Sequence, residues 1–140
     1  LALGATITTN QRSISSDDYF VGMFETALNS NEIITQISFP IPDKSSYIKF
    51  PNPASRYAMV GVFMAKTGNK VNVAITGASE NGVFRSSEIE NALTANFTLE
   101  SIDGLNISSD GLISDIHASS SYRANLIKEM AKRALKEIIT

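Results

Sequence analysis

One strand in the middle of the chain constrains the fold more than any other segment. Residues 57–66 are nearly all apolar, which is typical of a central strand that is buried on both faces. Gly68-Asn69 follows closely, and both residue types tolerate the positive φ angles of a two-residue hairpin turn. Residues 71–75 then alternate between large apolar and smaller or polar side chains, as a returning strand does. The pattern predicts an antiparallel pair of strands inside a sheet.

A long helix at the carboxyl end is expected to cover that sheet. From Ser119 to about residue 139, apolar residues recur at the spacing of one helix face. These residues are Tyr122, Leu126, Met130, Ala134 and Ile138. A shorter helix is expected at 88–95 and further strands at 46–50 and 32–39. Because strands come first and helices last, without β–α–β alternation, the sequence predicts an α+β fold: an antiparallel sheet with C-terminal helices packed on one face.

The composition excludes several classes of function. With 140 residues, 43% of them hydrophobic, the chain can bury one core. It has no cysteine and a single histidine, His117, so it cannot ligate an iron–sulfur cluster through thiolates or hold zinc with a histidine cluster. A net charge of −2 provides no basic surface for nucleic acid, and no apolar run approaches the roughly 20 residues of a membrane-spanning helix. We therefore expect a cytoplasmic protein whose metal chemistry, if any, lies on a partner.

Two prolines mark a boundary between two parts of the chain. Pro40-Ile41-Pro42 stops the alternating strand, since proline cannot donate to a strand ladder. We therefore divide the chain into residues 1–41 and residues 42–140. Leu1 begins in the middle of an apolar pattern and no methionine precedes it, so we expect a fragment of a longer protein.

The bend between the strands at 46–50 and 57–66 is the best candidate for a binding site. Residues 51–53, Pro-Asn-Pro, fix the bend, and a buried strand follows it. A side chain that leaves this bend is therefore held in a defined direction. The bend is flanked by one lysine, Lys49, and one tyrosine, Tyr57. We expect this loop to face a cofactor.

Several segments also occur in an order and spacing that point to one family. They are Leu3–Ala5 with Asp18–Gly22, Leu28–Ile34, Lys49–Val62 and Ser114–Arg123. Together they resemble the medium, FAD-binding subunit of the molybdenum hydroxylases, the family of aerobic carbon monoxide dehydrogenase and xanthine dehydrogenase. The last segment is similar to the family's Asp-x-Arg-x-Ser-x-x-Tyr-Arg stretch, with His117 where arginine is usual.

The resemblance implies a domain assignment and three site residues. It makes residues 1–41 the tail of the FAD-binding domain and residues 42–140 the C-terminal domain of the flavoprotein. It places Ile34 at the isoalloxazine edge, Lys49 near the flavin and Tyr57 over one ring face. Stacking suits an aromatic side chain, and a nearby lysine favours the reduced, anionic flavin. Without the resemblance, Ile34 caps a core, Lys49 is a solvated edge residue and Tyr57 is an ordinary strand aromatic.

The resemblance also implies a function and partners. The chain would be part of an oxidoreductase subunit and would help to form the FAD site that passes electrons from [2Fe–2S] clusters to an external acceptor. The molybdenum cofactor would lie on a large subunit and two [2Fe–2S] clusters on a small subunit. Arg56 stands where the family often has an acidic residue, which leaves the acceptor open between quinone, NAD and oxygen.

We expect the isolated chain to lack part of the FAD site, and two alternative functions remain open. The family's glycine loops for the FAD pyrophosphate belong to its first domain, and no such loop occurs here, so we expect the isolated chain to bind FAD weakly and to be inactive. One alternative is a non-catalytic subunit-docking module without flavin contact. The other is a dimerisation domain like that of the NAD-linked disulfide reductases, although no matching histidine–glutamate pair is evident.

Overall fold

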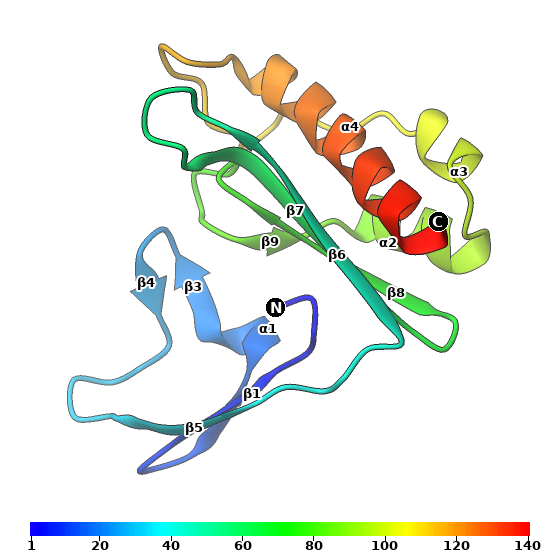
Figure 1. Cartoon of the computed structure of the whole chain (residues 1–140). Helices are drawn as coiled ribbons and strands as arrows, with labels where there is room; N and C mark the ends of the chain where they lie inside the picture. The colour runs from blue at the N-terminus through cyan, green and yellow to red at the C-terminus, as the bar shows by residue number, and fades with distance from the viewer.

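The computed structural model describes residues 1–140, which form a small N-terminal part and a larger sheet covered by helices (Figure 1). The elements in chain order are β1 (Thr6–Thr9), β2 (Ser13–Ser15), α1 (Ser16–Tyr19), β3 (Phe20–Gly22), β4 (Glu25–Thr26), β5 (Ile34–Ser38), β6 (Lys44–Pro51), β7 (Ala58–Thr67), β8 (Lys70–Thr76), β9 (Phe84–Arg85), α2 (Ser87–Ala95), α3 (Glu100–Asp103) and α4 (Ser120–Ile139).

The central sheet is antiparallel, with the strand order β6-β7-β8-β9. The apolar strand β7 is central, as predicted, and the two-residue turn joins it to β8 with Thr67 opposite Lys70. Only Gly68 of the two turn residues has a positive φ, 57°. A type II′ turn needs a positive φ at its first central residue alone, so this hairpin belongs to that type rather than to type I′.

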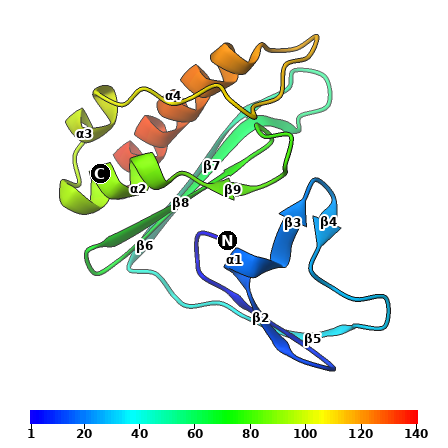
Figure 2. The same ribbon diagram turned by 180° about the vertical axis from the view of Figure 1, so that it is seen from behind.

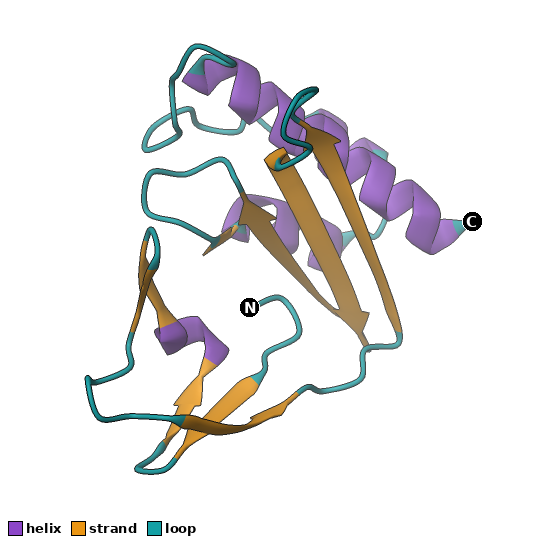
Figure 3. Ribbon diagram, turned by 60° about the vertical axis from the view of Figure 1, so that its left-hand side comes forward, coloured by secondary structure: helices purple, strands orange, loops and turns teal.

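The helices cover one face of this sheet. In Figure 3, α4 crosses behind β6 and β7, and α2 lies against β8. Alternate residues of β7, Val60, Val62 and Met64, point into the core and pack with buried residues of α4 such as Ile127 and Met130. The predicted α+β fold, with C-terminal helices on one face of an antiparallel sheet, is confirmed.

Helix α4 is fixed at both of its ends. The side chain of Ser119 accepts a hydrogen bond from the backbone N–H of Tyr122, which caps the start of the helix as the sequence predicts. At the other end, the Lys44 ammonium donates to the carbonyl of Ile138 at 2.8 Å. A cation beside the C-terminal carbonyls stabilises the helix dipole. These contacts hold α4 against the edge strand β6.

The N-terminal part contains a three-stranded sheet of order β2-β1-β5 and a short β3–β4 hairpin. Strands β1 and β2 form a hairpin around Asn10 and Gln11, with Ile7 opposite Ile14. The helical turn α1 is capped by Ser15 and ends at Tyr19, and Gly22 lies in β3. Strand β5 exists as predicted, yet every residue in it is exposed, so neither of its faces packs on a core within this chain.

The N-terminal part lies against the sheet face that the helices leave open (Figure 2). The Asn72 side chain of β8 donates to the carbonyl of Ala2 at 2.8 Å, and the Arg85 guanidinium contacts Asp17 at 3.4 Å. Residues 39–43 connect the two sheets. The predicted division at residue 41 falls within this connection, while the assignment of the first part to an FAD-binding domain remains a prediction. None of the helices is both long and apolar enough to cross a membrane.

Candidate functional site

The bend between β6 and β7 is a rigid loop. The side-chain oxygen of Asn52 accepts the backbone N–H groups of Ala54 and Ser55 at 2.9 and 3.1 Å. The backbone of Asn52 donates to the carbonyl of Tyr57 at 2.7 Å and accepts from the N–H of Arg56 at 2.9 Å. One asparagine thus makes four hydrogen bonds across the loop. The sequence prediction of a fixed bend at this position is confirmed.

Arg56 carries backbone strain at the end of this loop. Its φ is 65°, a left-handed conformation that side chains other than glycine seldom adopt. This conformation directs the Arg56 carbonyl toward Lys49, whose ammonium donates to it at 3.1 Å. Strained residues persist where the surrounding structure holds them and are concentrated at functional sites. Here the strain places a positive charge beside Tyr57.

Tyr57 extends into solvent from the end of the bend. Its side chain is 80% exposed, whereas β7, which begins at the next residue, is largely buried. Helix α4 holds the start of strand β7, because the buried guanidinium of Arg123 in α4 donates to the carbonyl of Met59 at 2.6 Å. An exposed aromatic ring on a fixed backbone offers one flat apolar face to a ligand or partner.

The structure does not bring Ile34 to this bend. Ile34 lies in β5, where it pairs with Thr9 and is 37% exposed. In Figure 1, β5 runs along the bottom of the molecule, whereas the loop that joins β6 to β7 lies at the top left. The chain therefore unites two of the predicted site residues, Lys49 and Tyr57. Contact of any of the three with a flavin remains a prediction.

A group of exposed apolar side chains in and just after the N-terminal sheet was not predicted from the sequence. We call it the apolar N-terminal surface. Its exposed members are Phe20, Val21, Met23, Phe24, Ile33, Ile34, Ile37, Phe39 and Ile41. Phe24, at the tip of the β3–β4 hairpin, is fully exposed and has a positive φ of 61°. The signal in the sequence was the group of four large apolar residues around Gly22.

An ion pair between the half-exposed Arg12 and the buried carboxylate of Glu32 holds the base of β5. The Arg12 guanidinium contacts both carboxylate oxygens of Glu32, at 2.7 and 3.0 Å. The backbone N–H of Asn29 and the hydroxyl of Thr9 also donate to this carboxylate. The hydrogen bond from Arg12, followed by that from Asn29, lowers the pKa of Glu32 from 4.5 to about 2. Glu32 is therefore a structural anion that fixes the entry to β5.

The segment before α4 forms a second polar cluster. Asp115 accepts the backbone N–H groups of His117 and Ala118, and it also accepts the Arg123 guanidinium at 2.8 Å. These contacts lower the pKa of Asp115, and the His117 N–H contributes most. His117 is an exposed loop residue whose backbone N–H is hydrogen-bonded to Asp115. No group of three or more metal-ligating side chains occurs in the chain.

Comparison with known proteins identifies relatives along the whole chain, although no protein-family profile matches it. The chain is 30% identical to the glyceraldehyde dehydrogenase medium chain of Sulfolobus acidocaldarius, over 98% of its own length and 54% of the relative. It is 29% identical to the nicotine 6-hydroxylase medium subunit of Paenarthrobacter nicotinovorans, over 91% and 48%. It is 26% identical to the carbon monoxide dehydrogenase medium chain of Hydrogenophaga pseudoflava, over 89% and 47%. The chain thus spans about half the length of the curated relatives it matches.

A solved structure has the same fold. The crystal structure of quinoline 2-oxidoreductase from Pseudomonas putida 86 superposes with a TM-score of 0.74 at 22% identity, covering 98% of this chain and 53% of that one. The two chains therefore share the arrangement of sheets and helices described above.

Proposed function

Because this chain belongs to the medium-subunit family of the molybdenum hydroxylases, we propose that it helps to form an FAD site that passes electrons from [2Fe–2S] clusters to an external acceptor. The relatives are oxidoreductase subunits whose names place them in multi-subunit enzymes. The proposal adds three points to family membership: the cofactor, the direction of electron flow and the residues that contact the cofactor.

The observation that carries the proposal is the exposed, fixed Tyr57 beside the ammonium of Lys49. An isoalloxazine ring is flat and aromatic, and an exposed tyrosine on a rigid loop suits offset stacking, worth about 0.5–1.5 kcal/mol beyond area burial. A positive charge held by a backbone carbonyl next to that ring suits a cofactor that becomes anionic on reduction. These two residues fit a flavin. Ile34 would contact the flavin only if the flavin extended as far as the distant strand β5.

FAD, when bound, supplies the capacity to take up electrons from a one-electron donor and to deliver them to an acceptor. The residues of this chain would orient the ring and tune its potential. Lys49 would favour the reduced form through its charge, and Tyr57 would exclude water from one face. Arg56 adds a second positive charge to the same loop, and this charge would influence which electron acceptor reacts with the flavin.

The apolar N-terminal surface supports assembly with further protein. Exposed apolar side chains that gather in one small part of a protein make that part a candidate interaction site. We propose that an FAD-binding domain, like the half of the relatives that this chain does not span, covers part of this surface. The molybdenum-binding large subunit and the iron–sulfur small subunit complete the proposed assembly. The same exposed surface equally favours the second candidate, a docking module without flavin contact.

One experiment tests the contribution of this chain alone. Titrate the isolated chain with FAD and follow flavin fluorescence and the dissociation constant. We expect weak binding, because the sequence offers no glycine loop for the pyrophosphate. Tight, stoichiometric binding would refute the view that this chain supplies only one wall of the site.

A second experiment separates the two candidates in the assembled enzyme. Prepare Tyr57→Ala and Lys49→Met with Lys70→Met as the control, since Lys70 is an exposed lysine at the β7–β8 hairpin. The first two should alter the flavin midpoint potential, Lys49→Met by lowering it, while substrate reduction of the molybdenum centre stays near normal. If both lose assembly or stability and leave the flavin potential unchanged, the docking module is the better account.

A further inference from the structure

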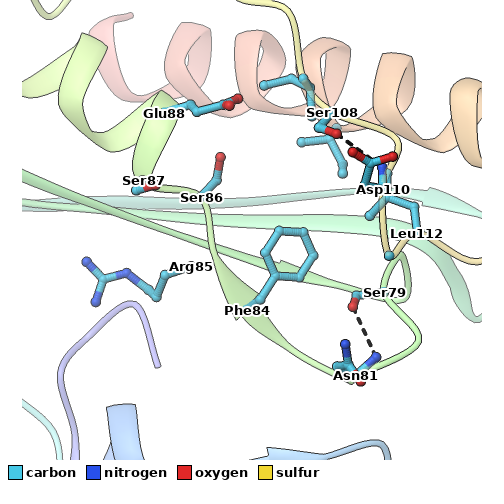
Figure 4. A pocket seen from close by; sticks show the side chains of 13 residues that line it. Ser79, Asn81, Phe84, Arg85, Ser86, Ser87, Glu88, Ser108, Asp110 and Leu112 are labelled. Atoms are coloured by element: carbon cyan, nitrogen blue, oxygen red, sulfur yellow. Dashed lines mark hydrogen bonds between the residues drawn. The ribbon is translucent and has the colours of Figure 1, made fainter.

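A pocket of about 270 Å³ opens at the start of α2, and it includes none of the residues proposed to face the flavin. Its walls come from the loop at 79–81, β9, the first turn of α2, the loop near residue 110 and one residue of α4, Ile127 (Figure 4). The volume corresponds to roughly nine water molecules in the liquid, so a small organic molecule fits.

Hydrogen-bond donors without partners converge on this pocket. Ser86 is the N-cap of α2 and only 8% exposed, yet its hydroxyl makes no hydrogen bond within the protein. Figure 4 shows this side chain turned toward the pocket. The backbone N–H groups of Ser87, Glu88 and Ile89 also lack acceptors within the chain. The first turn of a helix attracts an oxygen acceptor through its free N–H groups and its dipole.

Negative charge at the rim excludes an anion as the preferred ligand. The carboxylates of Glu88 and Asp110 both line the pocket, and both residues are exposed. The nearby Arg85 does not offset them, because its guanidinium is bound by Glu90 and by the Asn72 side chain at 2.7 Å. A phosphate or a carboxylate would therefore meet repulsion, whereas a neutral carbonyl oxygen would not. The same carboxylates accept hydrogen bonds from a ligand N–H.

The remaining wall of the pocket is apolar and would contact an apolar part of the ligand. Phe84 and Leu112 face the pocket between the helix start and the loop. We propose that this pocket binds a small neutral carboxamide that carries a compact apolar group. The amide oxygen accepts from Ser86 and the first turn of α2, the amide N–H donates to Asp110, and the apolar group packs on Phe84 and Leu112.

Benzamide is a suitable probe because it combines these three features. Titrate the isotopically labelled chain with benzamide and follow the backbone amide signals by NMR. We expect saturable shifts at Ser87, Glu88 and Ile89 with a dissociation constant on the order of a millimolar, as befits a ligand of this size. Ser86→Ala should weaken binding by about 3- to 10-fold, the effect of one hydrogen bond. Ser114→Ala, at an exposed serine outside the pocket, should bind like the unaltered chain.

Comparing benzamide with benzoate tests whether the pocket prefers a neutral ligand to an anion. Benzoate has the shape of benzamide, but it should bind more weakly because it faces Glu88 and Asp110. Asp110→Asn, at an exposed position where folding is not at risk, should narrow or reverse that preference. Absence of saturable shifts with benzamide, or tighter binding of benzoate or inorganic phosphate to the unaltered chain, would overturn the proposal.

Discussion

Arg123 connects α4 to the strand that follows the proposed flavin loop, and its removal should be costly. The side chain is 3% exposed. One guanidinium nitrogen donates to the carbonyls of Met59 and Gly77 at 2.6 and 3.1 Å, and the other contacts Asp115 at 2.8 Å. Arg123→Met retains much of the apolar stem and deletes all three contacts. This substitution therefore isolates the polar role of the residue.

The expected loss follows from the partners that the substitution leaves behind. A buried acceptor without a donor costs about 1–3 kcal/mol, so the two carbonyls of Met59 and Gly77 account for about 2–6 kcal/mol. Arg123 Nε is itself buried without a partner, and its removal returns about 1 kcal/mol. The contact with the partly exposed Asp115 adds little, as is usual for solvated ion pairs. We expect Arg123→Met to lower the free energy of unfolding by about 1–5 kcal/mol.

Urea denaturation followed by circular dichroism measures this loss. Arg133→Met is the matched control, because Arg133 lies on the same helix, is exposed and makes no hydrogen bond or ion pair. The control should change stability by less than about 0.5 kcal/mol. Arg123→Lys should fall between the two, since one ammonium cannot reproduce the forked contacts. A loss below about 1 kcal/mol for Arg123→Met would refute the idea that this side chain holds the sheet to the helix.

Three further predictions concern the loops and the N-terminal part. The pKa of Glu32 is lowered to about 2 in the folded chain, so its contribution to stability is complete above pH 4.5 and is lost as the pH falls toward 2; the difference in urea midpoint between the unaltered chain and Glu32→Gln should shrink over that range. Gly77→Ala should destabilise the chain by about 2 kcal/mol or more in the same assay, because Gly77 has a φ of 77° and an added Cβ would lie 2.2 Å from the Ala58 carbonyl. Tyr57→Ala should leave the melting temperature of the isolated chain nearly unchanged, because exposed residues contribute within about 0.5 kcal/mol; a large drop would show that the ring packs on this chain.

The central hairpin and the last helix were predictable because their signals are local. An apolar strand, a two-residue turn and a returning strand occupy residues 58–76 without interruption. The cap at Ser119 and the apolar stripe of α4 are likewise contiguous in sequence. Periodicity alone therefore located the sheet and the helix that covers it.

The exposure of β5 was not predictable from its own pattern. Its alternation of apolar and polar residues is that of a half-buried strand, yet Ile34 and Ile37 remain exposed here. Burial depends on which surface lies opposite, and that information is not contained in the strand itself.

Parts of the candidate site were also predictable from the sequence, and other parts were not. Lys49 and Tyr57 lie at the same bend because only seven residues separate them in the sequence, whereas the position of Ile34 depends on how two sheets pack. The pocket beside α2 was not foreseen, because Phe84, Ser86 and Asp110 meet only through the packing of a strand, a helix and a long loop. The sequence signal there was limited to two serines, Ser86 and Ser87, just before the helix expected at 88–95.

The central claim is that the loop carrying Tyr57 and Lys49 forms one wall of a flavin site. A crystal structure of the complete medium subunit with bound FAD tests it most directly. We predict that the Tyr57 ring lies over the isoalloxazine with ring centroids about 4.5–7 Å apart, and that the Lys49 ammonium lies beside the same ring. An isoalloxazine that contacts neither residue, with the loop covered by another subunit instead, would contradict the account.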